Sequence, residues 1–265
     1  MPKRDALDSD NESTISNVQV DLEFADFNDQ DFHGLKSLFK QLFSNDHQEI
    51  NLSSLSNQVV EHPFLGCTVK IDDSTDPYAA IGVVPFDSNT EAVLSVKSHL
   101  LSKCANDADL TALLNIGKLG FLFNERLINM PPQIYPQMLR MLIDELKVQE
   151  TQGNQLYTFT HFVVISKIYN EVDSLLDQEE AEEPVLKKQH IQTPLNTTPI
   201  YFQPEDEILG RFSLKSIDYV FKTSNETDSR RTFQECGIDP FRRIMVIPAN
   251  CLDAILKQVD LMFKQ

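Results

Sequence analysis

The stretch Lys118–Leu146 places an apolar strand directly before a helix, an arrangement that often binds a phosphate group. At such a helix start the backbone N–H groups point toward the ligand, and the helix dipole favours an anion. In this chain the first turns of the predicted helix hold Pro131, Pro132 and Pro136. Because proline has no N–H group to donate, the geometry suits a nucleotide or coenzyme while the donors for its phosphates are missing.

Acid–base chemistry has one candidate pair, Glu125 and Arg126, at the end of the same strand. General base catalysis needs a positioned partner group and a pocket. The neighbouring sequence indicates neither of them. We therefore interpret Glu125 and Arg126 as an ion pair or as a clamp at the entry to the helix.

Sequence motifs for metal binding and nucleophilic catalysis are also absent. The six histidines show no ligand-like spacing, and we expect His161 to pack within a strand. The four cysteines lie far apart without a CxxC pair, which indicates reduced thiols in an intracellular protein. No GxSxG, HExxH or GxxxxGK[ST] motif occurs. The four cysteines are Cys67, Cys104, Cys236 and Cys251. From these motifs and spacings we predict no catalytic residue, no cofactor and no metal site.

The net charge of −17 is concentrated in two segments. Residues 1–31 hold nine acids against Lys3 and Arg4, and residues 173–183 hold six acids and no base. The rest of the chain carries a net charge of only −4. We expect residues 1–17 to form a disordered acidic tail and residues 173–199 to form a flexible acidic insertion.

The acidic segments suit a basic partner. Acidic surfaces attract basic proteins, raise their association rates and compete with nucleic acid for them. A simpler interpretation is that these acids only keep the protein soluble. The predicted partner-binding residues are the acids of the insertion: Asp173, Asp177, Glu179, Glu180, Glu182 and Glu183.

Nucleic acid and membranes are not expected partners. The arginines Arg230, Arg231, Arg242 and Arg243 form the main basic cluster, but the overall charge opposes binding to a phosphate backbone. We expect these arginines to pair with carboxylates of the chain. No apolar run approaches the roughly 20 residues that span a bilayer, and the N-terminus has no signal-peptide core.

Apolar periodicity predicts an α/β (α+β) fold with a mixed central sheet. The long helix 132–147 should pack on that sheet. The predicted strands are 18–24, 67–71, 79–84, 119–123, 159–165, 200–202, 212–222 and 244–247. The predicted helices are 31–43, 51–61, 91–103, 109–116, 132–147 and 250–263. We expect residues 18–265 to form one domain, and the protein to be a monomer.

Four segments resemble the BCCIP family. The strongest match is NERLINMPPQI at 124–134, followed by its amphipathic helix. The others are GCTVKIDDSTDPY at 66–78, YTFTHFVVISKIY at 157–169 and DPFRRIMVIPANCLDAILKQV at 239–259. The resemblance extends from Val18 to the C-terminus.

The resemblance implies a fold like that of GCN5-related acetyltransferases without the coenzyme-binding features. Those enzymes hold a pyrophosphate with a Gln/Arg-x-x-Gly-x-Gly/Ala loop, whereas the corresponding turn here, Glu125–Pro132, has no glycine. The resemblance also implies a nuclear protein that escorts its partner rather than an enzyme. Fungal members are linked to protein export, ribosome assembly, vesicular transport and actin organisation, and animal members to cell-cycle and DNA-repair complexes.

These observations lead to one expected function and one alternative. We expect a non-catalytic nuclear chaperone, able to shuttle to the cytoplasm, that escorts a basic large-subunit ribosomal protein. It would support nuclear protein export and ribosome biogenesis. The alternative is a divergent GCN5-type acyltransferase that uses acyl-CoA.

Overall fold

The computed structural model describes residues 21–61, 65–72, 74–172, 198–221 and 236–264. The predicted tail 1–17 and most of the predicted insertion 173–199 lie outside these residues. Among the described residues, no helix combines the length and the apolar character needed to cross a membrane.

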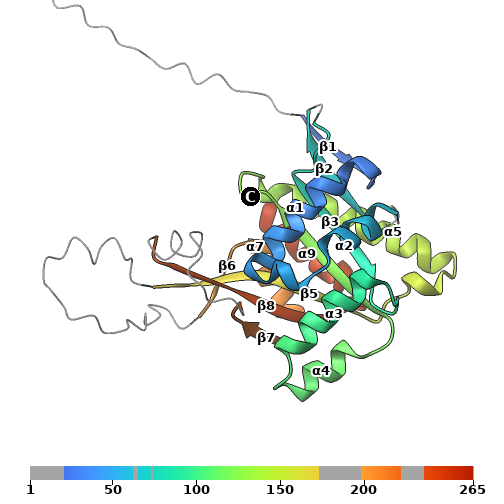
Figure 1. Ribbon diagram of the computed structural model, residues 1–265. Coiled ribbons are helices and arrows are strands. Elements are labelled where there is room, and N and C mark those ends of the chain that lie inside the picture. The colour runs from blue at the N-terminus through green and yellow to red at the C-terminus, as the bar shows by residue number, and fades with distance from the viewer. Residues whose placement is uncertain (1–20, 62–64, 73, 173–197, 222–235, 265) are drawn as a thin grey trace, which may run out of the picture.

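The framework of the fold is a mixed sheet with the strand order β1-β2-β3-β4-β5-β8-β7, and β6 pairs with β5 (Figure 1). All neighbouring strands are antiparallel except β4 and β5, which run parallel. The strands are β1 Leu22–Ala25, β2 Gly66–Ile71, β3 Ala79–Pro85, β4 Leu119–Arg126, β5 His161–Glu171, β6 Ile200–Tyr201, β7 Lys215–Tyr219 and β8 Ile238–Pro248. The predicted mixed sheet is confirmed.

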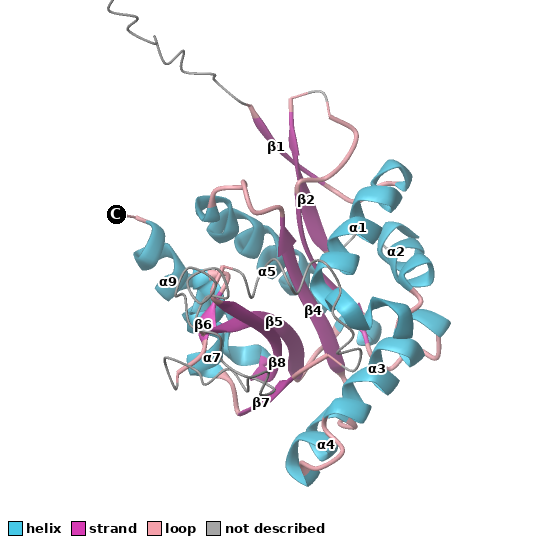
Figure 2. Ribbon diagram, turned by 60° about the vertical axis from the view of Figure 1, so that its left-hand side comes forward, coloured by secondary structure: helices cyan, strands magenta, loops and turns pink. Residues whose placement is uncertain are grey.

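Helices cover both faces of this sheet. Figure 2 shows α1, α2, α3 and α4 on one side and α5, α7 and α9 on the other. Their bounds are α1 Phe32–Phe43, α2 Leu52–Glu61, α3 Glu91–Lys103, α4 Ala108–Leu114, α5 Tyr135–Thr151, α7 Pro204–Phe212 and α9 Leu252–Phe263. The described helices and strands therefore form three layers.

Each layer of helices closes its own apolar core. Side chains alternate between the faces of a strand, so Phe121 and Phe123 of β4 join the core beneath α1–α4, while Leu122 joins the core beneath α5, α7 and α9. The buried run Leu119–Phe123 confirms the prediction of a central strand. The predicted packing of the long helix on the sheet is also confirmed, because α5 contacts β2 and β3.

Several helix boundaries follow local signals that the sequence already contains. The helix predicted at 91–103 has the same bounds in the structure, and Asp107 caps α4 by accepting a hydrogen bond from the Leu110 amide at 3.0 Å.

The predicted hairpin of 67–71 and 79–84 corresponds to the antiparallel pair β2–β3. At its start Gly66 has φ +131°, and a Cβ there would lie 2.0 Å from the Ile81 carbonyl oxygen, so this position requires glycine.

Three segments differ most from the prediction. Strand β5 continues to Glu171, six residues beyond the predicted 159–165. The predicted strand 212–222 is limited to β7, and the helix α7 precedes it. The sequence carried the signals for this helix, because Pro204 stands at its first turn and three acids follow, as is typical of a helix start. Strand β8 begins six residues before the predicted 244–247. Its Pro240 is tolerated because β7 pairs with Arg242–Val246 and, among the described strands, none pairs with that edge of β8 at Pro240.

Candidate functional site

The parallel strands β4 and β5 separate where their polar residues begin. Backbone pairing joins Leu119–Leu122 to His161–Val164, and then it stops, although both strands continue. Figure 2 shows β4 running on while β5 turns away from it. The opening between the two strands is the candidate site.

Helix α7 contributes acidic side chains to this opening. Arg126 of β4 forms a two-point ion pair with Glu205, in which Nη2 lies 3.1 Å from Oε2 and Nη1 contacts Oε1. Asn124 Nδ2 donates to Glu205 Oε1 at 3.2 Å. Ser166 of β5 donates to Asp206 Oδ2 at 2.5 Å. These groups are all buried, so the first turn of α7 fills the opening from one face of the sheet.

A second ion pair lies on the opposite face. Glu125, which is 1% exposed, accepts a charge-assisted hydrogen bond from Lys167 Nζ at 2.6 Å. Gln41 of α1 donates to the same Glu125 oxygen at 2.7 Å and to the Arg126 carbonyl at 3.0 Å. Of the two interpretations of Glu125 and Arg126, the ion pair between them is therefore wrong. Adjacent strand residues point to opposite faces, and each of these two finds its partner on its own side.

Burial raises the pKa of two groups on the α7 side, the Asp206 carboxyl and the Tyr135 phenol. Burial first, and then the charge of Glu205, raise the pKa of the Asp206 carboxyl well above its usual range. Burial also raises the pKa of the Tyr135 phenol, at the start of α5. Two buried donor groups here, the Tyr135 hydroxyl and Gln203 Nε2, have no hydrogen-bond partner among the described residues.

The turn that follows β4 offers few amides to an anion. After Leu127–Met130, a 3-10 turn at Pro132–Ile134 leads into α5. The Ile134 amide bonds to the Pro131 carbonyl, and the Tyr135 amide bonds to the Pro132 carbonyl. Pro131, Pro132 and Pro136 have no N–H group to donate, so this helix start offers fewer amides to an anion than a start without proline.

The two described members of the predicted arginine cluster, Arg242 and Arg243, point to different faces of β8 and do not form a joint basic surface. Arg242 is buried and donates to the Leu42 carbonyl at 2.6 Å and to the Gln41 carbonyl at 3.0 Å. Arg243 forms a two-point ion pair with Asp218 at 2.6 and 2.8 Å, so the expected pairing with a carboxylate is confirmed for Arg243. The other two members of the cluster, at 230 and 231, lie outside the described residues.

Metal and thiol chemistry have no support among the described residues. No group of three or more His, Cys, Asp or Glu residues in this part of the chain could hold a metal ion. The cysteines are free, and burial raises the pKa of Cys67 and of Cys104 to about 12. His161 is the first residue of β5, as the prediction of a strand position requires, and its half-buried side chain lies 3.1 Å from Thr160 Oγ1.

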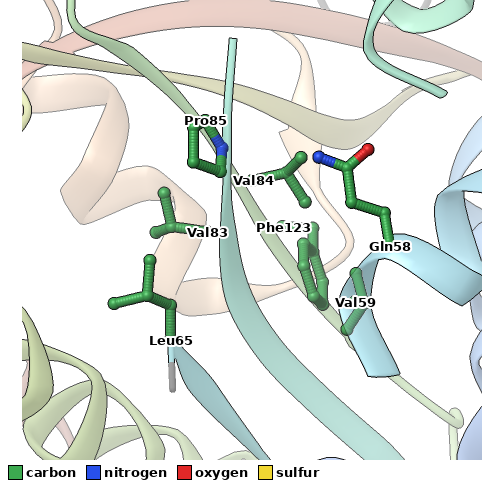
Figure 3. Close-up of a pocket in the computed structure, with 7 residues that line it drawn as sticks. All are labelled: Gln58, Val59, Leu65, Val83, Val84, Pro85 and Phe123. Atoms are coloured by element: carbon green, nitrogen blue, oxygen red, sulfur yellow. The ribbon is translucent and has the colours of Figure 1, made fainter. Parts of the chain in front are cut away.

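One small cavity lies between α2 and β3 (Figure 3). Its volume is about 10 Å³, which is room for about one water molecule. It is lined by Gln58, Val59, Leu65, Val83, Val84, Pro85 and Phe123. A coenzyme does not fit this cavity.

Sequence reasoning singled out Glu125 and Arg126 but missed their true partners. Lys167 and Glu205 carry no motif, and only the position of Glu205 in an acidic helix start was visible. The predicted partner-binding acids, Asp173 to Glu183, lie outside the described residues.

Comparison with known proteins places the chain in a family. The model of the BCCIP family matches residues 17–209. The chain belongs to the BCCIP family. Among BCCIP relatives, Protein bcp1 of Aspergillus oryzae is 35% identical over 97% of this chain and 91% of its own length. Protein bcp1 of Schizosaccharomyces pombe is 34% identical over 87% of this chain and 85% of its own length.

A solved structure supports the same BCCIP assignment at the level of the fold. The crystal structure of BCP1 from Saccharomyces cerevisiae matches with a TM-score of 0.62, covers 97% of both chains and is 18% identical in sequence. At that identity the likeness shows a shared fold. The BCCIP membership itself rests on the family match and on the fungal relatives.

Proposed function

We propose that this BCCIP protein is a non-catalytic nuclear chaperone that escorts a basic protein, a large-subunit ribosomal protein. The observation that carries the proposal is the buried ion pair of Arg126 with Glu205 in the opening between β4 and β5. An acetyltransferase of the GCN5 type would hold the pyrophosphate of its coenzyme with the loop that follows the central strand, which here is the loop after β4 beside this opening. Here a carboxylate of the chain itself occupies the opening, which favours a role for the outer surface.

The arrangement around the opening supports a GCN5-type scaffold with a lost site. A single parallel pair, β4 and β5, interrupts an otherwise antiparallel sheet, and α5 follows β4 directly. The fold thus keeps the strand-to-helix turn that would face a pyrophosphate. The prolines of this turn remove the amides that would bind the pyrophosphate.

The net negative charge of the protein supports a basic protein as its cargo. With a net charge of −17, the protein attracts basic chains and repels nucleic acid. A new ribosomal protein is strongly basic, so an acidic carrier can hold it until ribosomal RNA displaces the carrier. We place this activity in the nucleus, with shuttling to the cytoplasm, where it supports nuclear protein export and ribosome biogenesis. The links of fungal relatives to vesicular transport and actin would then follow from cargo export.

A pull-down from nuclease-treated nuclear extract, at low and at high salt, tests this function. We expect one basic ribosomal protein to be recovered, with binding that salt weakens but does not abolish. Such a result requires a shaped surface in addition to charge. Recovery of many basic proteins that all dissociate in high salt would contradict a specific escort.

The alternative function is a divergent acyltransferase. One observation favours it, the separation of β4 from β5. This function requires acyl-CoA to displace the first turn of α7. A thermal-shift titration with acetyl-CoA separates the two functions, because a ligand that binds the folded state raises its apparent stability. We expect no shift of the melting temperature. A shift that saturates with acetyl-CoA would support the acyltransferase.

A further inference from the structure

Strand β1 forms one outer edge of the sheet. Among the described residues, β1 pairs only with β2, at Leu22 to Ala25. Figures 1 and 2 both show β1 and β2 projecting beyond the helical layers. The outer side of β1 therefore stands away from the body of the protein.

The register shows which backbone groups face outward. The Asp72 amide donates to the Asp21 carbonyl at 3.0 Å, and these two residues lie opposite each other in the register of β1 and β2. In an antiparallel ladder, hydrogen-bonded pairs recur every second residue. Glu23 and Ala25 therefore continue the bonds to β2. The N–H and C=O groups of Leu22 and Phe24 point to the outer edge, where a further strand could pair with them.

Acids predominate in the segments that form and flank this edge. The described residues of 21–31 and 66–78 include seven acids and one lysine: Asp21, Glu23, Asp26, Asp29, Asp31, Asp72, Asp76 and Lys70. The lysine is buried and already bound to Asp31 at 2.7 Å. The remaining six acids are all exposed. A ligand of this edge must therefore bring positive charge.

We propose that the outer edge of β1 binds an extended, basic segment of a partner protein as an additional strand. Main-chain hydrogen bonds from Leu22 and Phe24 would hold the segment, and the acids would select its lysines and arginines. Leu22, which is 37% exposed, adds an apolar contact. The proposal rests on the proposed function, and it names the surface that recognises the basic cargo.

Charge argues against other occupants of the edge. A second copy of the chain would place the same acids opposite each other, and like charges across an interface cost binding energy. A nucleic acid would be repelled for the same reason. A basic peptide segment instead gains both the hydrogen bonds and the ion pairs.

The first experiment uses the full-length chain and the total proteins extracted from purified large ribosomal subunits. The retained protein is identified, purified and titrated to obtain its Kd. The key variant is Leu22→Pro, which removes an outward N–H group but no bond to β2. The matched control is Leu22→Ala, which loses the side chain and keeps the N–H group. We expect Leu22→Pro to weaken binding about tenfold, as for one lost hydrogen bond, and to exceed the effect of Leu22→Ala.

A second arm tests the charge of the edge. The triple variant Glu23→Gln, Asp26→Asn, Asp29→Asn should weaken binding and reduce its salt dependence. The comparison variant neutralises two acids of the predicted insertion, Asp173→Asn with Glu179→Gln. We expect the edge variant to have the larger effect on Kd.

Amide hydrogen exchange reports the added strand directly. In the complex the Leu22 and Phe24 amides should exchange more slowly, because they become hydrogen-bonded. Purely electrostatic attachment would leave their exchange unchanged and would overturn the proposal.

The outcomes separate the two proposals. If the wild-type chain retains no ribosomal protein, both the proposed function and the edge proposal fail. If it retains one that Leu22→Pro and the charge variant bind normally, only the edge proposal fails. A dimer of the chain that Leu22→Pro dissolves would overturn the basic segment as the occupant.

Discussion

The Arg126 guanidinium and the Glu205 carboxylate face each other inside the protein, although 79 positions separate them in the chain. Arg126 ends β4 and Glu205 lies in the first turn of α7. Glu205 is fully buried, and Arg126 is 9% exposed. The pair therefore joins two distant parts of the chain and closes the opening between β4 and β5.

Removal of one partner of this pair should destabilise the protein strongly. Glu205→Ala leaves the Arg126 charge buried without its carboxylate, which costs about 3–5 kcal/mol. Urea denaturation measures the loss in the free energy of unfolding. The double variant Arg126→Met, Glu205→Leu should recover much of it, because an apolar pair removes both charges.

The matched control for Glu205→Ala is Glu207→Ala on the same helix. Glu207 pairs with Arg211 at 2.6 Å, but the two side chains are 52% and 61% exposed. An exposed pair at this i,i+4 spacing contributes about 0.3–0.5 kcal/mol. Equal losses for the two variants would contradict a structural role for the buried pair.

Loss of the Tyr135 hydroxyl should not destabilise the protein. This hydroxyl is buried and has no hydrogen-bond partner among the described residues. Since burial of an unpaired hydroxyl is unfavourable, Tyr135→Phe should leave the free energy of unfolding unchanged or raise it by up to about 1 kcal/mol.

Tyr201→Phe provides the contrast, because the Tyr201 hydroxyl accepts a hydrogen bond from Arg243 at 2.6 Å. That variant should lose about 1 kcal/mol or more. Thermal or urea unfolding of both variants makes the comparison. A clear loss on Tyr135→Phe would mean that its hydroxyl has a partner in solution.

Glu145 should make stability depend on pH. Burial raises the pKa of its carboxyl from 4.5 to about 7, the hydrogen bond from the Gly66 amide opposes this rise, and the charge of Asp26 adds to it. The folded state thus holds the proton more tightly than the unfolded state. The stabilisation is complete below about pH 4.5 and is lost as the pH rises through about 7.

Glu145→Gln removes this titration and keeps an acceptor for the Gly66 amide. We expect the variant to be more stable than wild type at pH 8, with the difference shrinking toward pH 5. Urea denaturation at several pH values measures it. The exposed neighbour Asp144→Asn serves as the control, and an identical pH profile for the two variants would refute the assignment to Glu145.

Gly66 should tolerate no side chain. At φ +131° an alanine is strained, and its Cβ would meet backbone atoms of Ile81 and Gly82. We expect Gly66→Ala to cost more than about 2 kcal/mol. Gly153 has φ +70° with open space around it, so Gly153→Ala should cost about 1 kcal/mol. Similar melting temperatures for the two variants would contradict the close approach at Gly66.

Local patterns in the sequence were sufficient for most of the helices and strands. The apolar run Leu119–Phe123 identified the central strand, and Thr90 begins a helix whose bounds were predicted without error. Helix α7 was missed because its nine residues lie between two predicted strands, although Pro204 and the acids after it signalled a helix start. The helix-start signal was present, but the apolar residues on either side of it indicated strands.

The partners of the polar residues at the site, in contrast to the helices and strands, could not be predicted from local sequence patterns. Glu125 and Arg126 were visible as a charged pair at a strand end, yet their partners Lys167 and Glu205 lie far along the chain. Arg242 and Arg243 looked alike in sequence, but one is buried against backbone carbonyls of α1 and the other pairs with Asp218. No local pattern distinguishes them, because they differ only in the face of β8 from which they project.

The sequence by itself determined the mixed α/β class, the missing phosphate donors after β4 and the concentration of acids in two segments. Each of these depends on residue type and on short spacing, which hydrophobic periodicity, proline and charge reveal directly. Only the tertiary structure decided that α7 closes the opening between β4 and β5 and that β1 forms an acidic outer edge. Both depend on the order and direction of strands that are distant in sequence, and contacts of this kind leave no periodic signal in the chain.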